Sequence, residues 1–335
     1  MATQRLVAVS YPADDGYAAV NAEVLAGDAE VVYTYDLDDA QRRRTVRRAD
    51  ALLAYELPKE VPAGTLDGHG RLGFVQFLST GVDAVDFSQV PDMLTVACNA
   101  GAYAGAVSEH AVAMTLSLAK RLPQRHAALT AGRFDKWLPT LTLDGATCVI
   151  VGFGGIGTTT ARLLRAFGAR IYAVTRTGQT TEPADDAAGI EHLDRALAAA
   201  DVVVLSLPLT LSTRGLIGAR ELALMKPDAI LINVARGPII DQAALYEHLR
   251  THPEFSAGID TWWAEPTGDA PFSTDYPFLD LPNVLGSPHN SSIVAGNMVS
   301  AARLAAENVR RYLRGEEVTG VVRRSDYVAE QKRSW

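Results

Sequence analysis

The sequence predicts an α/β protein of two domains, Rossmann-like or flavodoxin-like, each with a parallel sheet and with a cleft between them. Three observations support this fold class. The chain of 335 residues is long for a single core. Strand-like and helix-like segments alternate along both halves. At residues 149–157 the run VIVGFGGIG leads from an apolar strand through a glycine-rich turn into a helix, after a substantial first unit.

The first hundred residues have the pattern of a parallel sheet with crossover helices. Short segments rich in β-branched or aromatic residues predict strands at 5–10, 31–35, 51–55, 72–78 and 95–98. Helices are predicted at 17–26 and 39–48. A long apolar helix follows at 108–121, ended by Pro123, and is either buried within the chain or used as a subunit contact.

A second α/β series begins at residue 147 and has enough βα units for a full Rossmann domain. Strands are predicted at 147–151, 170–175, 201–207, 229–234, 256–260 and 284–287, and helices at 156–167, 193–200, 219–225 and 241–250. The amphipathic helix at 293–314 has no place to pack in that domain, so we expect it to return to the first, followed by extended chain at 318–322. The expected domains are 1–100 plus 291–335 for substrate and 101–290 for a dinucleotide.

Composition excludes several classes of protein. With 48% hydrophobic and 21% charged residues, no membrane-length apolar run and no signal peptide, the chain is expected to be cytoplasmic. A net charge of −8 argues against nucleic-acid binding, and the basic run at 42–48, set between acidic residues, is typical of a solvated helix face. Cys98 and Cys148 lie in apolar strands without any Cys/His grouping, which predicts reduced core thiols and no metal site.

The glycine-rich turn predicts a dinucleotide site. Gly152 permits the tight turn, Gly154 leaves room for the phosphates, and Gly157 lets the helix pack on the strand. The N-terminus of the helix then offers unpaired N–H groups and a positive dipole end to an anion. Such a motif alone is weak, but here strand, turn and helix occur in order.

Three polar side chains follow later strands of the same predicted sheet. They are Arg236, Glu265 and His289. Singly, each has an ordinary interpretation as a turn cap, a solvated carboxylate or a satisfied loop histidine. Together, at the edge where such sheets bind ligands, they supply a cation, a carboxylate and an acid–base group.

At these residues the chain resembles the D-isomer-specific 2-hydroxyacid dehydrogenases, the family of glycerate, glyoxylate/hydroxypyruvate and phosphoglycerate dehydrogenases. The resemblance covers nearly the whole length. Its motifs are Ser79-Thr-Gly-Val-Asp83, Val107-Ser-Glu-His110, Leu143-Asp-Gly145, the GFGGIG turn, Leu207-Pro-Leu-Thr210 with Thr213, Met225-Lys-Pro227, Asn233-Val-Ala-Arg-Gly237, Gly258-Ile-Asp260, Glu265-Pro266 and Pro288-His289.

The resemblance implies a role for each site residue. Arg236, Glu265 and His289 match the family's catalytic residues, and the substrate contacts would be Thr80, Gly81, Val82, Arg236 and His289. The cofactor contacts would be Gly152, Gly154, Gly155, Ile156, Gly157, Thr175, Arg176, Pro208, Thr213, Val234, Ala235 and Asp260.

The implied reaction is hydride transfer between a nicotinamide and C2 of a 2-ketoacid or 2-hydroxyacid. Arg236 would hold the carboxylate and carbonyl with its planar fork. His289 would exchange the proton as acid or base, while Glu265 fixes its tautomer and favours imidazolium. Closure of the cleft would exclude water.

The cofactor's ribose site departs from the common pattern. NAD enzymes usually carry an acidic residue at the end of the second strand, about twenty positions past the glycines, but this chain has Thr175 followed by Arg176. A guanidinium with hydroxyls suits a 2′-phosphate, so the sequence favours NADP(H) over NAD(H). Alternatively, Thr175 accepts NAD without discrimination and Arg176 stacks on adenine.

Several points stay open at this level. Trp262 and Trp263 either narrow the substrate pocket or pack as core between the domains, and Asn290-Ser291-Ser292 replaces the small residues often seen there in the family. The substrate is hydroxypyruvate or glyoxylate, a phosphate- or phosphonate-bearing ketoacid, or a bulky branched ketoacid. By resemblance the enzyme is a homodimer, with residues 108–121 as the expected contact.

Other classes fit less well. Formate dehydrogenases would have Gln in place of Glu265, and L-specific dehydrogenases carry the glycine motif at the N-terminus. A nucleotide-sensing corepressor-like binding protein on the same fold is the alternative to an enzyme, although the tail at 323–335 is short.

Overall fold

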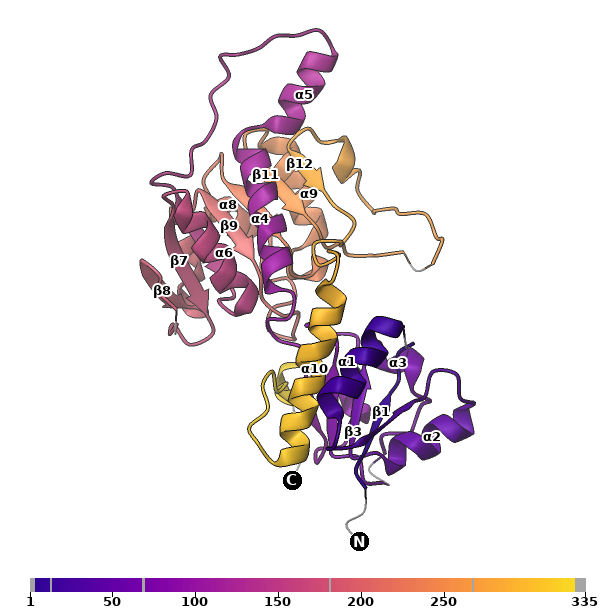
Figure 1. The fold of residues 1–335 in the computed structure, drawn as a ribbon. Helices are drawn as coiled ribbons and strands as arrows, with labels where there is room; N and C mark the ends of the chain where they lie inside the picture. The colour runs from indigo at the N-terminus through magenta and orange to yellow at the C-terminus, as the bar shows by residue number, and fades with distance from the viewer. Residues whose placement is uncertain (1–3, 13, 68–69, 181, 267, 329–335) are drawn as a thin grey trace, which may run out of the picture. The chain divides into compact units, whose positions relative to one another are not determined.

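A computed structural model describes residues 4–12, 14–67, 70–180, 182–266 and 268–328 (Figure 1). The chain forms two compact units, one of Met1–Tyr103 with Val294–Trp335 and one of Ala104–Ile293. Each unit is built on its own parallel sheet, which is the α/β class that the sequence predicts. In the described ranges no helix is long and apolar enough to cross a membrane.

The first unit has a five-stranded sheet in the order β2-β1-β3-β4-β5, with every neighbouring pair parallel. This is the flavodoxin-like order. Its strands are β1 (Leu6–Val9), β2 (Glu30–Tyr33), β3 (Ala51–Ala54), β4 (Phe74–Phe77) and β5 (Thr95–Ala97). Its helices are α1 (Asp15–Leu25), α2 (Asp39–Arg48), α3 (Leu57–Glu60) and α10 (Asn297–Arg314).

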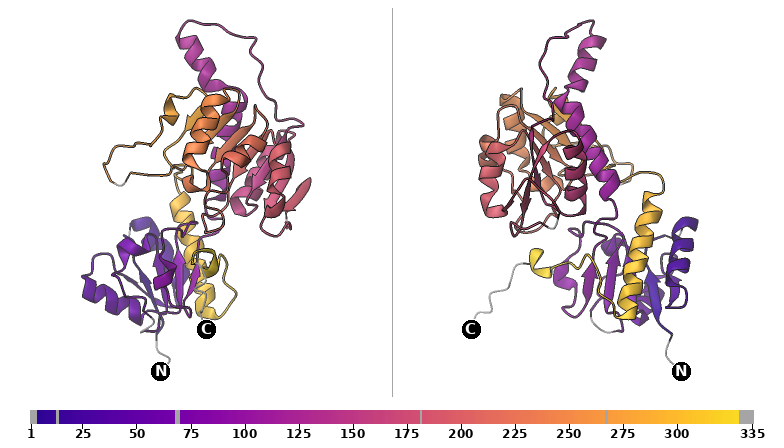
Figure 2. Two further views of the ribbon diagram at one scale, coloured as in Figure 1. Left: turned by 180° about the vertical axis from the view of Figure 1, so that it is seen from behind. Right: turned by 60° about the vertical axis from the view of Figure 1, so that its left-hand side comes forward.

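Helix α10 belongs to the first unit although it comes last in the chain. It lies beside α1 (Figure 2), and it also contacts β3 and β4. Side chains alternate along β1, so Val7 and Val9 pack with α1 and α10 while Ala8 faces Val46 of α2 on the other side. Both faces of this sheet are therefore covered by helices.

The second unit has a seven-stranded parallel sheet in the order β12-β11-β10-β9-β6-β7-β8. Its strands are β6 (Thr147–Val151), β7 (Arg170–Thr175), β8 (Asp186–Gly189), β9 (Val202–Leu205), β10 (Ile230–Asn233), β11 (Ser256–Ile259) and β12 (Val284–Gly286). Its helices are α4 (Ala104–Ala119), α5 (Leu122–Thr130), α6 (Gly155–Ala166), α7 (Leu193–Ala199), α8 (Ala219–Leu224) and α9 (Gln242–Thr251).

This strand order is that of a Rossmann sheet with one strand added at an edge. Strands β6 and β9 are neighbours, and the order of the chain reverses between them. Ligands of such sheets bind outside the carboxyl ends of the strands at this point. Helices α4 and α6 pack together, and α4 also contacts β10 and β11. The central strands are buried on both faces, which explains why β9 is apolar throughout.

Several elements differ from the sequence prediction. Strand β8 was missed, because Asp-Ala-Ala-Gly has no β-branched or aromatic residue. Pro123 does not terminate the long helix, because α4 already ends at Ala119. Arg121 then takes a φ of 51°, and Pro123 lies in the first turn of the next helix, α5. Helix α10 begins only at Asn297, after Gly296 with a φ of 76°. The predicted extended chain at 318–322 makes a single antiparallel bridge, Val321 to Ala97.

Candidate active site

The glycine-rich turn follows β6 at the point where the strand order reverses. Gly152 has a φ of 93°, and a Cβ there would lie 2.7 Å from the carbonyl oxygen of Ser206. A Cβ on Gly157 would lie 2.1 Å from the carbonyl oxygen of Gly152. Both positions therefore require glycine for the turn and for the approach of α6 to the strand. Gly154 differs, because a Cβ there would meet no atom within 4 Å.

Helix α6 begins beside this open space. Its N-cap is Gly154, which offers no side chain to the first N–H groups. Gly155 and Ile156 form the first turn. Free N–H groups at the positive end of a helix dipole bind anions. The turn therefore has both the space and the donors that a pyrophosphate requires.

The other predicted cofactor residues lie after neighbouring strands of the same sheet. Thr175 ends β7, and its hydroxyl donates to the carbonyl of Gln179 at 3.1 Å; the next residue, Arg176, is exposed. After β9 the Thr213 hydroxyl donates to the carbonyl of Pro208 at 2.7 Å. After β10, Val234 and Ala235 are buried. All of these positions lie at the carboxyl ends of the strands, where a dinucleotide would run along the sheet.

Asp260, directly after β11, is fully buried. Its Oδ1 accepts hydrogen bonds from the Ser287 hydroxyl at 2.6 Å and from the Asn290 N–H at 3.2 Å. Its Oδ2 is buried and has no hydrogen-bond partner among the described residues. Because an unpaired buried carboxylate oxygen is costly, this atom is suited to a donor from a ligand.

Sequence reasoning did not find the partners of Asp260. His110 on α4 places Nε2 2.9 Å from the Ser287 hydroxyl oxygen. Because that hydroxyl donates its single proton to Asp260, His110 Nε2 must carry a proton and donate. His110 occurs in a motif of the family resemblance and Ser287 directly precedes another, but only the fold shows that they meet.

His289 and Glu265 form the hydrogen-bonded pair of the site. His289 Nδ1 lies 2.8 Å from Glu265 Oε2, and the N–H of Trp262 donates to Glu265 Oε1 at 3.0 Å. Partial burial raises the pKa of the Glu265 carboxyl. The hydrogen bonds from His289 and Trp262 and the charges of His289 and Arg236 outweigh that effect, so the pKa lies below its usual value. Glu265 is therefore ionised near neutral pH and accepts the Nδ1 proton.

The backbone of His289 is held in an uncommon conformation. Its φ is 49°, in the left-handed region that is unfavourable for most side chains. Its N–H donates to the carbonyl of Asp260 at 2.8 Å, and the N–H of Ser287 donates to the carbonyl of Ile259 at 2.9 Å. Such conformations persist where the surroundings enforce them, and they gather at functional sites. The side chain is 37% exposed and can reach a ligand.

Arg236 lies on the turn after β10, one strand from Glu265. The side chain of Asn233 donates to its carbonyl at 2.9 Å and fixes this turn. Arg236 Nη1 donates to the carbonyl of Ala235 at 2.8 Å. The next residue, Gly237, lies against the backbone of Trp262, where a Cβ would come within 2.3 Å of the carbonyl carbon. The three predicted catalytic residues thus follow the adjacent strands β10, β11 and β12.

The predicted substrate residues Thr80, Gly81 and Val82 belong to the first unit, directly after β4. The Thr80 hydroxyl donates to the carbonyl of Asn99 at 3.4 Å, and the Ser79 hydroxyl donates to the carbonyl of Gly81 at 2.8 Å. Val82 is buried. This turn lies at the carboxyl edge of its sheet, as a ligand-binding loop of an α/β unit does.

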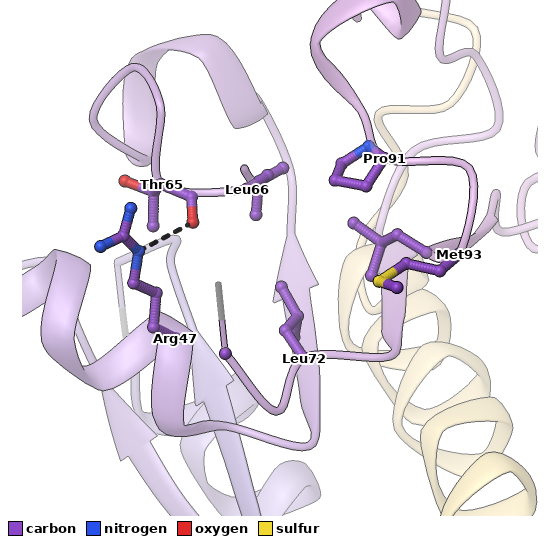
Figure 3. Close-up of a pocket in the computed structure, with 8 residues that line it drawn as sticks. Arg47, Thr65, Leu66, Leu72, Pro91 and Met93 are labelled. Carbon is purple, nitrogen blue, oxygen red and sulfur yellow. Dashed lines mark hydrogen bonds between the residues drawn. The ribbon is translucent and has the colours of Figure 1, made fainter. Parts of the chain in front are cut away.

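The first unit also has a shallow depression with mostly apolar walls, shown in Figure 3. Its one guanidinium, Arg47, donates to the carbonyl of Thr65 at 3.4 Å and pairs with Asp67. None of the predicted site residues lines it.

The packing of the second unit bears on two open questions from the sequence. Trp262 lies in the apolar core of the second unit and is 6% exposed, so it has little surface to offer a substrate pocket, and Trp263 packs against the same core. The apolar character of α4 is explained by its burial against α6, β10 and β11. The expectation that residues 108–121 form a subunit contact stays a prediction. Of the three residues after His289, Ser291 is buried and the Asn290 N–H binds Asp260.

Comparison with known proteins finds relatives that cover most of the chain. Residues 112–291 match the family model for the D-isomer specific 2-hydroxyacid dehydrogenase, NAD binding domain. A glyoxylate reductase from Thermococcus gammatolerans is 32% identical over 289 residues, covering 81% of this chain and 82% of that protein. A D-3-phosphoglycerate dehydrogenase from Methanocaldococcus jannaschii is 30% identical over 305 residues, which cover 90% of this chain but 56% of that protein. The chain therefore spans little more than half of the latter enzyme.

Solved structures of the same family are similar to this chain over nearly its full length. The crystal structure of a D-isomer specific 2-hydroxyacid dehydrogenase from Xanthobacter autotrophicus Py2, in complex with NADPH and MES, has a TM-score of 0.79. It is 28% identical, and the alignment covers 96% of this chain and 99% of that one. The match to the family over more than half of the chain, together with a relative 32% identical over 81% of it, shows that the protein belongs to the D-isomer-specific 2-hydroxyacid dehydrogenase family of NAD(P)-dependent oxidoreductases.

Proposed function

We propose that this enzyme reduces a small 2-oxoacid with NAD(P)H and, in the reverse direction, oxidises the D-2-hydroxyacid. The observation that carries the proposal is the 2.8 Å hydrogen bond between His289 Nδ1 and Glu265 Oε2 at the carboxyl edge of the second unit's sheet. With Nδ1 bound to a carboxylate, Nε2 is the ring nitrogen that exchanges a proton with substrate. Glu265 holds the tautomer and stabilises the imidazolium from which reduction begins.

The residues present fit a nicotinamide dinucleotide. The open space at Gly154 and the uncapped start of α6 suit its pyrophosphate. The unpaired Oδ2 of Asp260 suits a donor such as the carboxamide N–H of the nicotinamide. The bound nicotinamide supplies or accepts the hydride. We accordingly assign dinucleotide binding to residues 101–290 and substrate binding to residues 1–100 with 291–335.

Arg236 is assigned to the substrate's carboxylate and carbonyl. A planar guanidinium makes two parallel hydrogen bonds to such a pair of oxygens, which a point charge cannot do. It also polarises the carbonyl toward the alkoxide that His289 protonates. The backbone of residues 80–82 is assigned to the carboxylate by the family resemblance.

The role of Arg236 is tested with oxamate, which has a carboxylate next to a carbonyl but resists reduction. Arg236→Met is expected to weaken oxamate binding to the NADH-loaded enzyme about tenfold or more, because a charge-assisted hydrogen bond contributes about 1.5–3 kcal/mol. Isothermal titration calorimetry measures the affinity of the enzyme for oxamate and for NADH. Cofactor affinity is the internal control. It should stay within about twofold of wild type, because Arg236 is assigned to the substrate and its hydrogen bonds are not made to the cofactor. Unchanged oxamate affinity would contradict the assignment.

The preference for NADP(H) is a further part of the proposal. It rests on Thr175 and the exposed Arg176 at the end of β7, the position at which NAD enzymes usually carry an acidic residue. Arg176→Ala is expected to weaken NADPH binding about tenfold or more while leaving NADH affinity nearly unchanged. Thr175→Asp should reverse the preference by repulsion. A wild-type enzyme that binds NADH more tightly than NADPH in fluorescence titration would refute this preference.

We further propose a homodimer, with its contact on residues 108–121, as the sequence predicts, and on the segment around α5. Phe134 and Trp137 are 81% and 82% exposed, and Leu122 and Leu129 of α5 are more than half exposed. Figure 1 shows α5 and the chain after it extending away from the sheet of the second unit. Exposed aromatic side chains gathered on one segment are typical of a protein interface.

The dimer is tested by replacing Phe134 and Trp137 together with serine. Sedimentation velocity should change from a dimer to a monomer, because these side chains would supply most of the apolar contact area. Met93→Ser is the matched control, since Met93 is 76% exposed but lies on the other unit. A wild-type monomer at micromolar concentration, or a double variant that remains dimeric, would contradict the proposal.

A further inference from the structure

We propose that Trp262 is a positioning residue for the acid–base pair. This one residue contacts the three loops that carry His289, Glu265 and Arg236, and so holds them in place relative to one another. This inference rests on the proposed function of those three residues. It also gives a role to one of the two tryptophans, for which the sequence left two interpretations open.

The first contact holds the His289 loop. The indole N–H of Trp262 donates to the carbonyl of Ser287, two residues before His289, at 2.8 Å. Together with the backbone bonds of Ser287 to Ile259 and of His289 to Asp260, it fixes the chain on both sides of Pro288. His289 has a φ of 49° and needs such support to remain in that conformation.

The second and third contacts hold the other two loops. The backbone N–H of Trp262 donates to Oε1 of Glu265 at 3.0 Å, while Oε2 of the same carboxylate binds His289. The carbonyl group of Trp262 lies against Gly237, the residue after Arg236, so closely that no Cβ fits between them. One residue therefore contacts the segments of all three proposed catalytic side chains.

The indole itself has little freedom to move. It is 6% exposed and packs edge-to-face on Phe272, with ring centroids 4.9 Å apart. On another side it lies against Gly286, where a Cβ would come within 2.9 Å of the ring. A ring held on several sides gives its N–H a fixed direction, so the hydrogen bond to Ser287 can locate the His289 loop.

Trp263 is a natural control. Its indole N–H also donates to a backbone carbonyl, that of Ile240, at 2.7 Å. It also belongs to the core of the second unit and stacks on Phe278 at 5.2 Å. Its indole bond joins the segment of Glu265 to Ile240, four residues after Arg236, and does not reach the His289 loop. Trp263→Phe therefore removes the same kind of hydrogen bond from the same core while leaving the bond that holds the His289 loop in place.

The experiment compares Trp262→Phe with Trp263→Phe. Both should lose comparable stability, because each loses one indole hydrogen bond and some packing. Trp262→Phe alone should lower kcat about ten- to hundredfold, as a small misplacement of a reacting group does. The pH profile for reduction should also change in Trp262→Phe and not in Trp263→Phe, because only Trp262→Phe removes the bond that holds the His289 loop.

A second readout does not depend on turnover. In wild type and Trp263→Phe, proton NMR should show the His289 Nδ1–H in its bond to Glu265, assigned by its absence in His289→Ala. Trp262→Phe should shift or broaden this signal. If that variant folds poorly, β-benzothienylalanine at position 262 keeps the ring's shape and removes only the N–H, with the same expected result.

The inference is overturned if the two phenylalanine variants have the same Nδ1–H signal and the same pH profile. The proposed function fails separately, if the wild-type enzyme consumes neither NADPH nor NADH with any 2-oxoacid. In that case the NMR comparison still decides whether Trp262 positions the pair.

Discussion

Replacing His289 with alanine will lower the rate of 2-oxoacid reduction about 10²–10⁴-fold, the usual contribution of a general acid. The alkoxide formed by hydride addition would then have to take its proton from water. Binding of NAD(P)H should change little, because the imidazole is not among the groups assigned to the cofactor. Steady-state rates and a fluorescence titration of the cofactor measure the two effects.

Two variants separate this effect from a loss of structure. Asparagine tolerates a positive φ better than most residues do. His289→Asn should therefore fold as wild type does and be as inactive as the alanine variant. His192→Ala removes an exposed histidine next to β8 and should leave the rate unchanged. A His289→Ala rate within about tenfold of wild type would be too small a loss for a general acid and would refute the proton-transfer role.

Replacing Gly157 with alanine will destabilise the second unit and abolish tight cofactor binding. The new Cβ would lie 2.1 Å from the Gly152 carbonyl oxygen, so strand and helix must separate. Overpacking of this kind costs about 1–3 kcal/mol or more. Thermal unfolding should show a lower Tm, and titration should show weak binding of both NADPH and NADH.

Gly154→Ala is the matched variant in the same turn. A Cβ there meets no atom of the protein within 4 Å, so Tm should stay unchanged. Cofactor affinity should nevertheless fall, because the methyl group occupies the space assigned to the pyrophosphate. If Gly154→Ala binds the cofactor as tightly as wild type does, the phosphates do not lie at this turn.

Much of the fold could be predicted because local signals agree with tertiary packing. The apolar runs of β6 and β7 have the bounds expected from sequence, and α2 coincides with its prediction because Asp38 caps its first turn. The prediction of the fold failed where one local sequence signal is compatible with two structures. Pro123 can stop a helix or stand in the first turn of a new one, and only the φ of 51° at Arg121 decides between them.

The site was predictable only in part. Arg236, Glu265 and His289 could be named because polar residues after apolar strands collect at one edge of a parallel sheet. The residues that surround them could not be named from the sequence. His110 and Ser287 are separated by 177 positions, and they meet because α4 packs against the sheet. The exposed segment after α5 was missed as well, since exposure of Trp137 depends on what the rest of the chain leaves uncovered.

The most direct test of the proposed reaction is the oxidation of NADPH and NADH, side by side, with 2-oxoacids from glyoxylate to phenylpyruvate. We predict turnover with at least one 2-oxoacid, faster with NADPH, and a product of D configuration wherever C2 becomes chiral. Turnover with NADH alone would overturn the cofactor preference and leave the mechanism standing. No turnover with either cofactor would contradict the proposed reaction and favour a nucleotide-sensing binding protein on the same fold.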